Sequence, residues 1–125
     1  MKNLIDSSGW VEYFTAGTNA QFFIQPIQAV ENLLVPTICI YEVFKRLLLD
    51  VDEESALQGV GVMALGQEVE LSRTIAMEAA RIAVEHKLAM ADSIILATAH
   101  TYDAALWTQD KHFKTIAGVN YFEKK

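Results

Sequence analysis

The sequence predicts an α/β fold in which helices pack against a mainly parallel sheet of four or five strands. Short apolar segments alternate with longer amphipathic ones along the whole chain, which is typical of strand and helix units in sequence. Hydrophobic residues make up 52% of the 125 residues and charged residues 21%, so the chain is too apolar to be disordered. This length suffices for one sizeable core. We therefore expect a single domain over residues 1–125.

The N-terminal half is expected to hold two short strands and four helices. Residues 2–6 are the first strand, and the two serines that follow are candidate N-caps of a helix that ends near Gly17. A second helix over residues 19–32 has to accommodate Pro26 near its start or as a kink. The strand and two helices that follow are expected at residues 33–35, 38–49 and 52–65.

The C-terminal half is expected to hold three strands and two helices. Residues 69–71 are a candidate strand, and Ser72 caps a helix whose isoleucines and alanines form one apolar stripe. Asp92 then opens a helix of small and apolar residues at 93–101. The last strands are expected at residues 104–107 and 119–122, separated by a turn at residues 110–113.

The charge balance is acidic. Ten lysines and arginines against sixteen acidic residues give a net charge of -6, which at first argues against a nucleic-acid partner. The acidity is uneven, because residues 1–72 hold ten acids and three bases whereas residues 73–125 hold six acids and seven bases. Any basic surface is therefore expected mostly from the C-terminal half.

Cysteine content and hydropathy suggest where the protein resides. Cys39 is the single cysteine, so the chain has no internal disulfide and suits a reducing compartment. No uncharged apolar stretch is long enough to span a bilayer, so no membrane partner is expected. These two features predict a cytoplasmic protein.

Three carboxylates lie where an α/β fold gathers functional groups, and a fourth lies within an apolar helix. Asp6 closes the first strand, and Asp110 follows the fourth. Asp92 opens a helix, and Glu42 lies in an apolar helix where an unpaired carboxylate needs a cation. Side chains at the carboxyl ends of parallel strands become neighbours, and clustered carboxylates repel one another unless a divalent ion neutralises them. The pattern favours a Mg²⁺ or Mn²⁺ site of the kind used in phosphodiester hydrolysis.

Each carboxylate also has a purely structural interpretation. Asp92 alone fits a helix N-cap, and Asp110 alone fits a turn residue. Asp6 fits a turn as well as a site, and Glu42 can pair with Arg46 one helical turn later. The joint arrangement is what favours a metal site.

Four segments of the sequence resemble the successive motifs of the PIN domain, in particular the VapC-type ribonuclease toxins. They are centred on Ile5-Asp6-Ser7-Ser8, Tyr41-Glu42-Val43, Ala91-Asp92-Ser93 and Thr108-Gln109-Asp110. The resemblance covers essentially the whole chain, and each motif carries one acid. It departs from the family pattern at Gly9, where a larger apolar residue is expected, and at Ser93, where alanine is expected.

The resemblance implies a Mg²⁺- or Mn²⁺-dependent endoribonuclease with a three-layer α/β/α sandwich, usually dimeric and held inactive by a cognate antitoxin. Asp6, Glu42, Asp92 and Asp110 match the acidic tetrad of the family. Hydrolysis of RNA by a metal-activated water would leave 5′-phosphate and 3′-hydroxyl ends. The expected partners are thus RNA, an antitoxin and a second copy of the chain.

Several residues near the tetrad are candidates for supporting roles. The hydroxyls of Ser7 and Thr108 can orient a carboxylate or contact a phosphate, or simply cap a helix or a turn. The bases that follow the motifs can contact the RNA backbone or stay solvated: Lys45, Arg46, Lys111 and Lys114, with His112 beside them. The three histidines have no spacing typical of a ligand set, so they are interpreted as surface or half-buried side chains.

Two other classes of protein fit parts of the pattern. A non-catalytic PIN-like module that binds RNA or a protein is the main alternative, although all four acids are present. A phosphotransfer receiver domain requires paired acids near the first strand, whereas Asp6 is followed by serines. A P-loop enzyme is excluded, because no glycine-rich run ends in Lys-Ser or Lys-Thr.

Overall fold

The computed structural model describes residues 1–125, which form five strands, six α-helices and two 3₁₀ turns. The strands are β1 (Asn3–Ile5), β2 (Leu33–Pro36), β3 (Gln67–Val69), β4 (Ala105–Thr108) and β5 (Val119–Tyr121). The helices are α1 (Ser7–Phe14), α2 (Gln21–Gln28), α3 (Thr37–Asp50), α4 (Glu53–Met63), α5 (Arg73–His86) and α6 (Met90–Thr101). The 3₁₀ turns are η1 (Val30–Asn32) and η2 (Lys111–Phe113).

The five strands form one sheet in the order β3-β2-β1-β4-β5, and every pairing is parallel. Leu4 of the central strand lies opposite Leu34 on one side and Leu106 on the other. The chain winds outward through β2 and β3, then returns to the other side of β1 for β4 and β5. Such a reversal opens a crevice at the carboxyl ends of the two strands involved, here β1 and β4. The predicted parallel sheet is confirmed.

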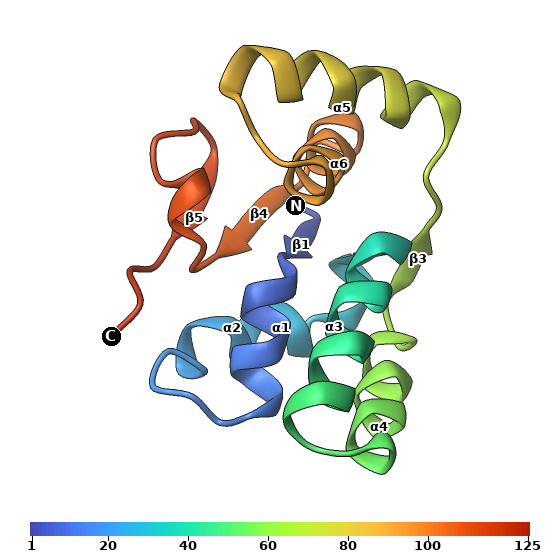
Figure 1. The fold of residues 1–125 in the computed structure, drawn as a ribbon, viewed down its shortest axis with the longest axis vertical. Helices are drawn as coiled ribbons and strands as arrows, with labels where there is room; N and C mark the ends of the chain where they lie inside the picture. The colour runs from blue at the N-terminus through green and yellow to red at the C-terminus, as the bar shows by residue number, and fades with distance from the viewer.

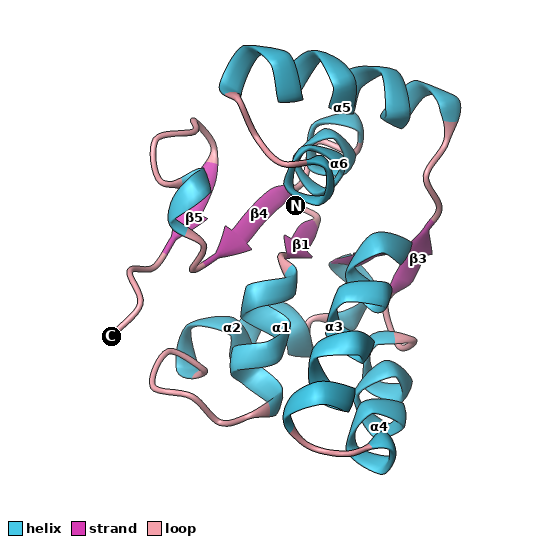
Figure 2. Ribbon diagram, viewed as in Figure 1, coloured by secondary structure: helices cyan, strands magenta, loops and turns pink.

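Helices cover both faces of the sheet. Figure 1 shows α5 and α6 over one face and α1 to α4 over the other, and Figure 2 shows the strands as the layer between them. All residues of β2 are buried, as expected for an interior strand of a parallel sheet. Trp10 and Phe23, from the first two helices, are wholly buried in the core. The three-layer α/β/α sandwich implied by the resemblance is therefore confirmed.

Two elements are divided or placed differently from the sequence prediction. The helix expected over residues 19–32 is α2 followed by the separate turn η1, and Pro26 lies near the end of α2 rather than its start. Proline has no N–H for the helical ladder, and the helix ends two residues later. The strand expected at 69–71 lies at 67–69, because it pairs directly with β2 and places Glu68 opposite Val35.

Two helices also begin earlier than expected. The first starts at Ser7, with Asp6 in the N-cap position, so neither serine caps it. The helix expected from residue 93 starts at Met90. None of the six helices combines the length and the apolar character that crossing a membrane requires.

The departures at Gly9 and Ser93 both have a packing explanation. A Cβ at Gly9 would lie 2.7 Å from the Phe23 ring and 2.8 Å from Ile5, so the ring fills the space of a larger side chain. The buried Ser93 hydroxyl donates to the Met90 carbonyl at 2.8 Å, so its polar atom is satisfied within the helix. Neither departure therefore disturbs the neighbouring carboxylates.

Candidate active site

The four predicted carboxylates converge at the carboxyl ends of β1 and β4. Asp6 directly follows β1, and Asp110 lies two residues beyond β4. Asp92 lies in the first turn of α6, and Glu42 lies on α3. The charges of the other three each raise the pKa of Asp92, so all four act on one another electrostatically. The crevice that the topology predicts is where the four acids meet.

Asp6 is the most buried of the four, with 3% of its surface exposed. Its backbone N–H still bonds to Trp107 of β4, which sets its side chain beside Thr108. The Ser8 and Thr108 hydroxyls donate to Oδ2 of Asp6 at 2.7 and 2.8 Å. Burial raises the pKa of Asp6, and these two hydrogen bonds partly offset that effect. The hydroxyls thus hold the carboxylate in one orientation.

Glu42 is half-buried and held by a different serine. The Ser7 hydroxyl donates to Oε1 of Glu42 at 2.7 Å, across 35 positions of sequence. The alternative that Glu42 pairs with Arg46 is wrong, because Nε of Arg46 lies 2.9 Å from Asp50. The cation expected beside Glu42 is therefore not supplied by its own helix.

Asp92 is not a helix cap. The helix begins at Met90 with Ala89 in the N-cap position, which places Asp92 inside the first turn. There its charge interacts favourably with the positive end of the helix dipole while its side chain turns toward the crevice. The N-cap interpretation of Asp92 is therefore wrong, because the helix extends further back than the sequence suggested.

The pKa of Asp92 is raised from 3.8 to about 7. Burial of the side chain is the main cause, and the nearby charge of Asp110 is the second. Asp6 and Glu42 act in the same direction, whereas His112 lowers the pKa. A carboxylate that binds its proton this tightly beside other carboxylates marks a site that lacks a compensating positive charge.

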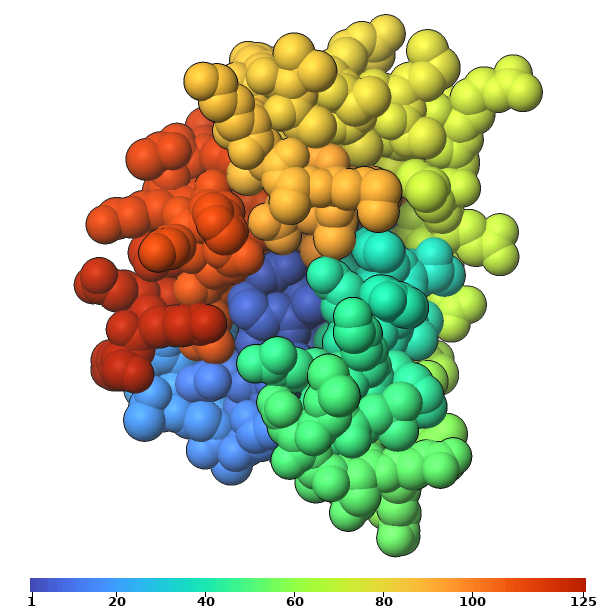
Figure 3. Space-filling model, viewed as in Figure 1, coloured from blue at the N-terminus to red at the C-terminus, as the bar shows by residue number.

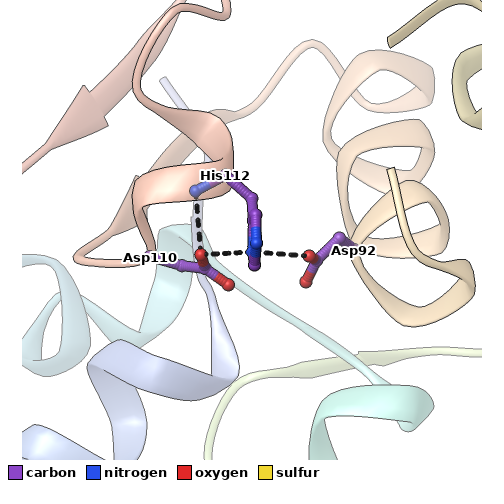
Figure 4. A group of neighbouring side chains, drawn as sticks. All are labelled: Asp92, Asp110 and His112. Carbon is purple, nitrogen blue, oxygen red and sulfur yellow. Dashed lines mark hydrogen bonds and ion pairs between the residues drawn. The ribbon is translucent and has the colours of Figure 1, made fainter. Parts of the chain in front are cut away.

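Asp110 and His112 lie on one turn. Oδ1 of Asp110 accepts the backbone N–H of His112 at 2.9 Å and caps η2, so the turn interpretation of Asp110 is confirmed. The same oxygen lies 2.8 Å from Nδ1 of His112, which in turn lies 3.7 Å from Oδ2 of Asp92 (Figure 4). His112 is exposed, as the sequence predicted, but its ring also faces the carboxylates, which the sequence analysis did not predict. Its position two residues after Asp110 is the sequence feature that could have indicated this contact.

The donor set fits a divalent cation. No lysine or arginine forms an ion pair with any of the four carboxylates, and the neighbouring donors are hydroxyls, one imidazole and the backbone N–H of His112. Asp92, Asp110 and His112 offer ligand atoms that all lie within 4.8 Å of one another. Carboxylate oxygens are the ligands that Mg²⁺ and Mn²⁺ prefer. The residues present therefore suit such an ion.

Thr108 links the Asp6 carboxylate to the backbone of Asp110, and its replacement by valine tests that link. Its wholly buried Oγ1 donates to Asp6 and accepts the backbone N–H of Asp110 at 2.9 Å. Thr108→Val leaves both groups without this partner, so the free energy of unfolding in urea should fall by about 1–3 kcal/mol. Thr101→Val is the control, because the Thr101 hydroxyl bonds only to Ala97 in its own helix. Equal effects of the two substitutions would contradict the link.

A cavity of about 870 Å³ lies between α1, α3 and the C-terminus, and Glu42 is the one member of the four carboxylates that lines it. In Figure 3 the blue N-terminal segment is visible at the centre of the face, between the green α3 and the orange and red C-terminal third. Polar and basic residues along the cavity include Ser7, Glu42, Lys45, Arg46, Lys124 and Lys125. The C-terminal lysines were missing from the predicted set of basic residues, whereas Lys111 and Lys114 do not line the cavity.

A buried polar network that sequence reasoning missed braces the chain just before Asp110. Glu12 accepts the Asn19 backbone N–H at 2.8 Å and Nε2 of Gln109 at 3.2 Å. Nδ2 of the fully buried Asn19 donates to Gln109 at 3.1 Å and to the Glu123 carbonyl at 2.9 Å. Apart from Glu12 and Asn19, the residues that hydrogen-bond to one another in this network are 90 or more positions apart in the sequence. No local sequence pattern could therefore predict these hydrogen bonds.

Comparison with known proteins agrees with this fold. A family model described as the PIN domain matches residues 4–119. No curated protein sequence matches the chain.

Solved structures with the same fold include three toxin–antitoxin proteins. A toxin–antitoxin complex from Klebsiella pneumoniae has a TM-score of 0.80 at 23% identity, over 94% of this chain and 95% of that one. VapC20 of Mycobacterium tuberculosis, a sarcin-ricin loop cleaving toxin, has a TM-score of 0.79 at 12% identity, over 95% and 98%. VapBC2 of Rickettsia felis, bound to a promoter DNA fragment, has a TM-score of 0.76 at 12% identity, over 100% of both chains. With 116 of its 125 residues spanned by the family model, this chain belongs to the PIN domain family.

Proposed function

We propose that this protein is a Mg²⁺- or Mn²⁺-dependent endoribonuclease that acts as the toxin of a toxin–antitoxin pair. The observation that carries the proposal is the convergence of Asp6, Glu42, Asp92 and Asp110 without a lysine or arginine among them. The toxin–antitoxin assignment is supported by the solved structures that share this fold.

The chain's own residues would divide the work of the site. Asp6, Asp92 and Asp110 would hold the ion directly, and Glu42, oriented by Ser7, would hold it through water or assist a second ion. When bound, a divalent cation supplies an activated water and neutralises the charge that develops on the phosphate. Thr108 and Ser8 would keep Asp6 aligned while the substrate binds. Cleavage would leave 5′-phosphate and 3′-hydroxyl ends.

The cavity that Glu42 lines would receive the RNA backbone. Lys45 and Arg46 line it on α3, and Lys124 and Lys125 line it at the C-terminus. Positive side chains of this kind bind phosphates without reading the bases. Lys111, exposed next to Asp110, would add a contact at the edge of the site. A local basic border of this kind would allow RNA to bind although the net charge is -6.

The proposed protein partner is an antitoxin, and we place both in the cytoplasm together with the RNA. An acidic cluster that lacks its own basic counter-charge would attract a basic side chain of such a partner. That contact would compete with the divalent ion, and the toxin would stay inactive while it persists. A second copy of the chain completes the set of proposed partners.

Incubation of the purified protein with total RNA tests the activity. Cleavage should occur with Mg²⁺ or Mn²⁺ and stop in EDTA, and the products should be substrates for ligation at both ends without prior end repair. A 2′,3′-cyclic phosphate end, or equal cleavage in EDTA, would contradict the proposed chemistry. RNA binding without cleavage under any metal condition would instead favour the non-catalytic PIN-like module.

A further inference from the structure

His112 is the single histidine that the structure places against the carboxylate cluster. Its Nδ1 lies 2.8 Å from Oδ1 of Asp110 and 3.7 Å from Oδ2 of Asp92. Figure 4 shows the imidazole between the two carboxylates, of which Asp110 directly precedes η2 and Asp92 lies in α6. The ring therefore faces the same space as the two acids.

The separations of these atoms suit ligands of one ion. Bonds of about 2.1 Å place adjacent ligands of an octahedral ion about 3 Å apart and opposite ligands about 4 Å apart. The distances from Nδ1 of His112 to Asp110 and Asp92, 2.8 and 3.7 Å, are close to this range. The imidazole nitrogen is therefore placed as a third ligand atom for an ion held by the two carboxylates.

The turn does not need the imidazole for its own stability. Asp110 already caps η2 by accepting the backbone N–H of His112, and the wholly buried Phe113 anchors the turn in the core. The His112 side chain is 62% exposed, so packing does not fix the ring in place. An exposed imidazole on an anchored turn can exchange its hydrogen bond to Asp110 for a bond to a metal.

We infer that His112 is a metal ligand of the site and that its nitrogen shifts the preference of the site from Mg²⁺ toward Mn²⁺. The inference rests on the proposed divalent-cation site. Mg²⁺ is bound almost entirely through oxygen, whereas imidazole is a good ligand for transition metals. A site with four carboxylates alone would favour Mn²⁺ less.

Manganese binding to the metal-free protein tests the inference without any measurement of activity. Electron spin echo spectra of the Mn²⁺ complex should show coupling to an imidazole nitrogen, and His112→Gln should abolish it. Titration should give His112→Gln a Mn²⁺ affinity lower by on the order of tenfold, with a smaller change for Mg²⁺. His86→Gln is the control, because His86 lies at the end of α5 near Glu85. It should keep both the coupling and the affinity.

The possible outcomes separate this inference from the proposed function. Mn²⁺ bound without nitrogen coupling, or with coupling unchanged in His112→Gln, overturns the ligand role and leaves the divalent site standing. Equal losses of Mn²⁺ and Mg²⁺ affinity in His112→Gln overturn the metal preference. Failure of the native protein to bind Mn²⁺ at all overturns both the ligand role and the divalent site.

Discussion

Asp92→Asn should reduce RNA cleavage by at least about 10³-fold, because loss of a proposed metal ligand removes several kcal/mol of transition-state stabilisation. Asn has the shape of Asp but lacks the charge that an ion would neutralise. The fold should persist, since Asp92 makes no capping hydrogen bond. The substitution also removes the repulsion between the Asp92 charge and the like charges of Asp110, Asp6 and Glu42. Cleavage rates with Mg²⁺ or Mn²⁺, together with circular dichroism of the variant, measure both effects.

Asp103→Asn is the matched control for this loss of activity. It removes the same charge just beyond the other end of α6, where the backbone has a φ of 51° that asparagine also tolerates. Its cleavage rate should equal that of the native protein. An Asp92→Asn variant that is folded and cleaves RNA within tenfold of the native rate would contradict the proposed site.

The metal-free protein should become more stable to urea as the pH falls from about 8 to about 5, the reverse of ordinary acid denaturation. The folded state raises the pKa of Asp92 from 3.8 to about 7, so within this window the folded chain holds a proton that the unfolded chain has lost. This stabilisation is complete below the unfolded pKa and disappears as the pH rises through the folded value. Between pH 8 and pH 5 it amounts to at most about 3 kcal/mol.

One control variant makes the pH dependence specific to the site. Asp92→Asn should flatten the dependence, because the titrating group is gone. Asp52 acts in the opposite sense, since its N-cap bond to Ser55 lowers its pKa. Its contribution to stability therefore changes only at pH values at or below the ordinary aspartate pKa, outside the window measured. Urea unfolding curves in EDTA provide the measurement. Stability that rises with pH in both proteins would contradict a carboxylate cluster without a counter-charge.

The features that the sequence determined by itself are those that depend on neighbouring residues. The N-cap of α5 is an example, since the predicted cap Ser72 accepts the backbone N–H of Ile75 at 3.2 Å. The alternation of apolar strands and amphipathic helices predicted the parallel sheet, which is confirmed. The position of three acids beside strand or helix ends was also readable, because it follows from the local pattern.

The ends of helices and strands were predicted less well where contacts with other parts of the fold determine them. Residues 67–69 form a strand through pairing with β2, although their own pattern is weak. The start of α6 at Met90 depends on the loop from α5, which places Lys87 in a left-handed conformation. These boundaries are set by tertiary packing, which overrides local propensity.

Only the tertiary structure decided which partner each carboxylate has and how strongly each holds its proton. Ser7 reaches Glu42 across 35 positions, and Thr108 reaches Asp6 across 102. The raised pKa of Asp92 and the approach of His112 likewise require the pairing of β1 with β4 and the docking of α6. Burial and charge interactions depend on distances in space, and residues a hundred positions apart come close only when the sheet forms.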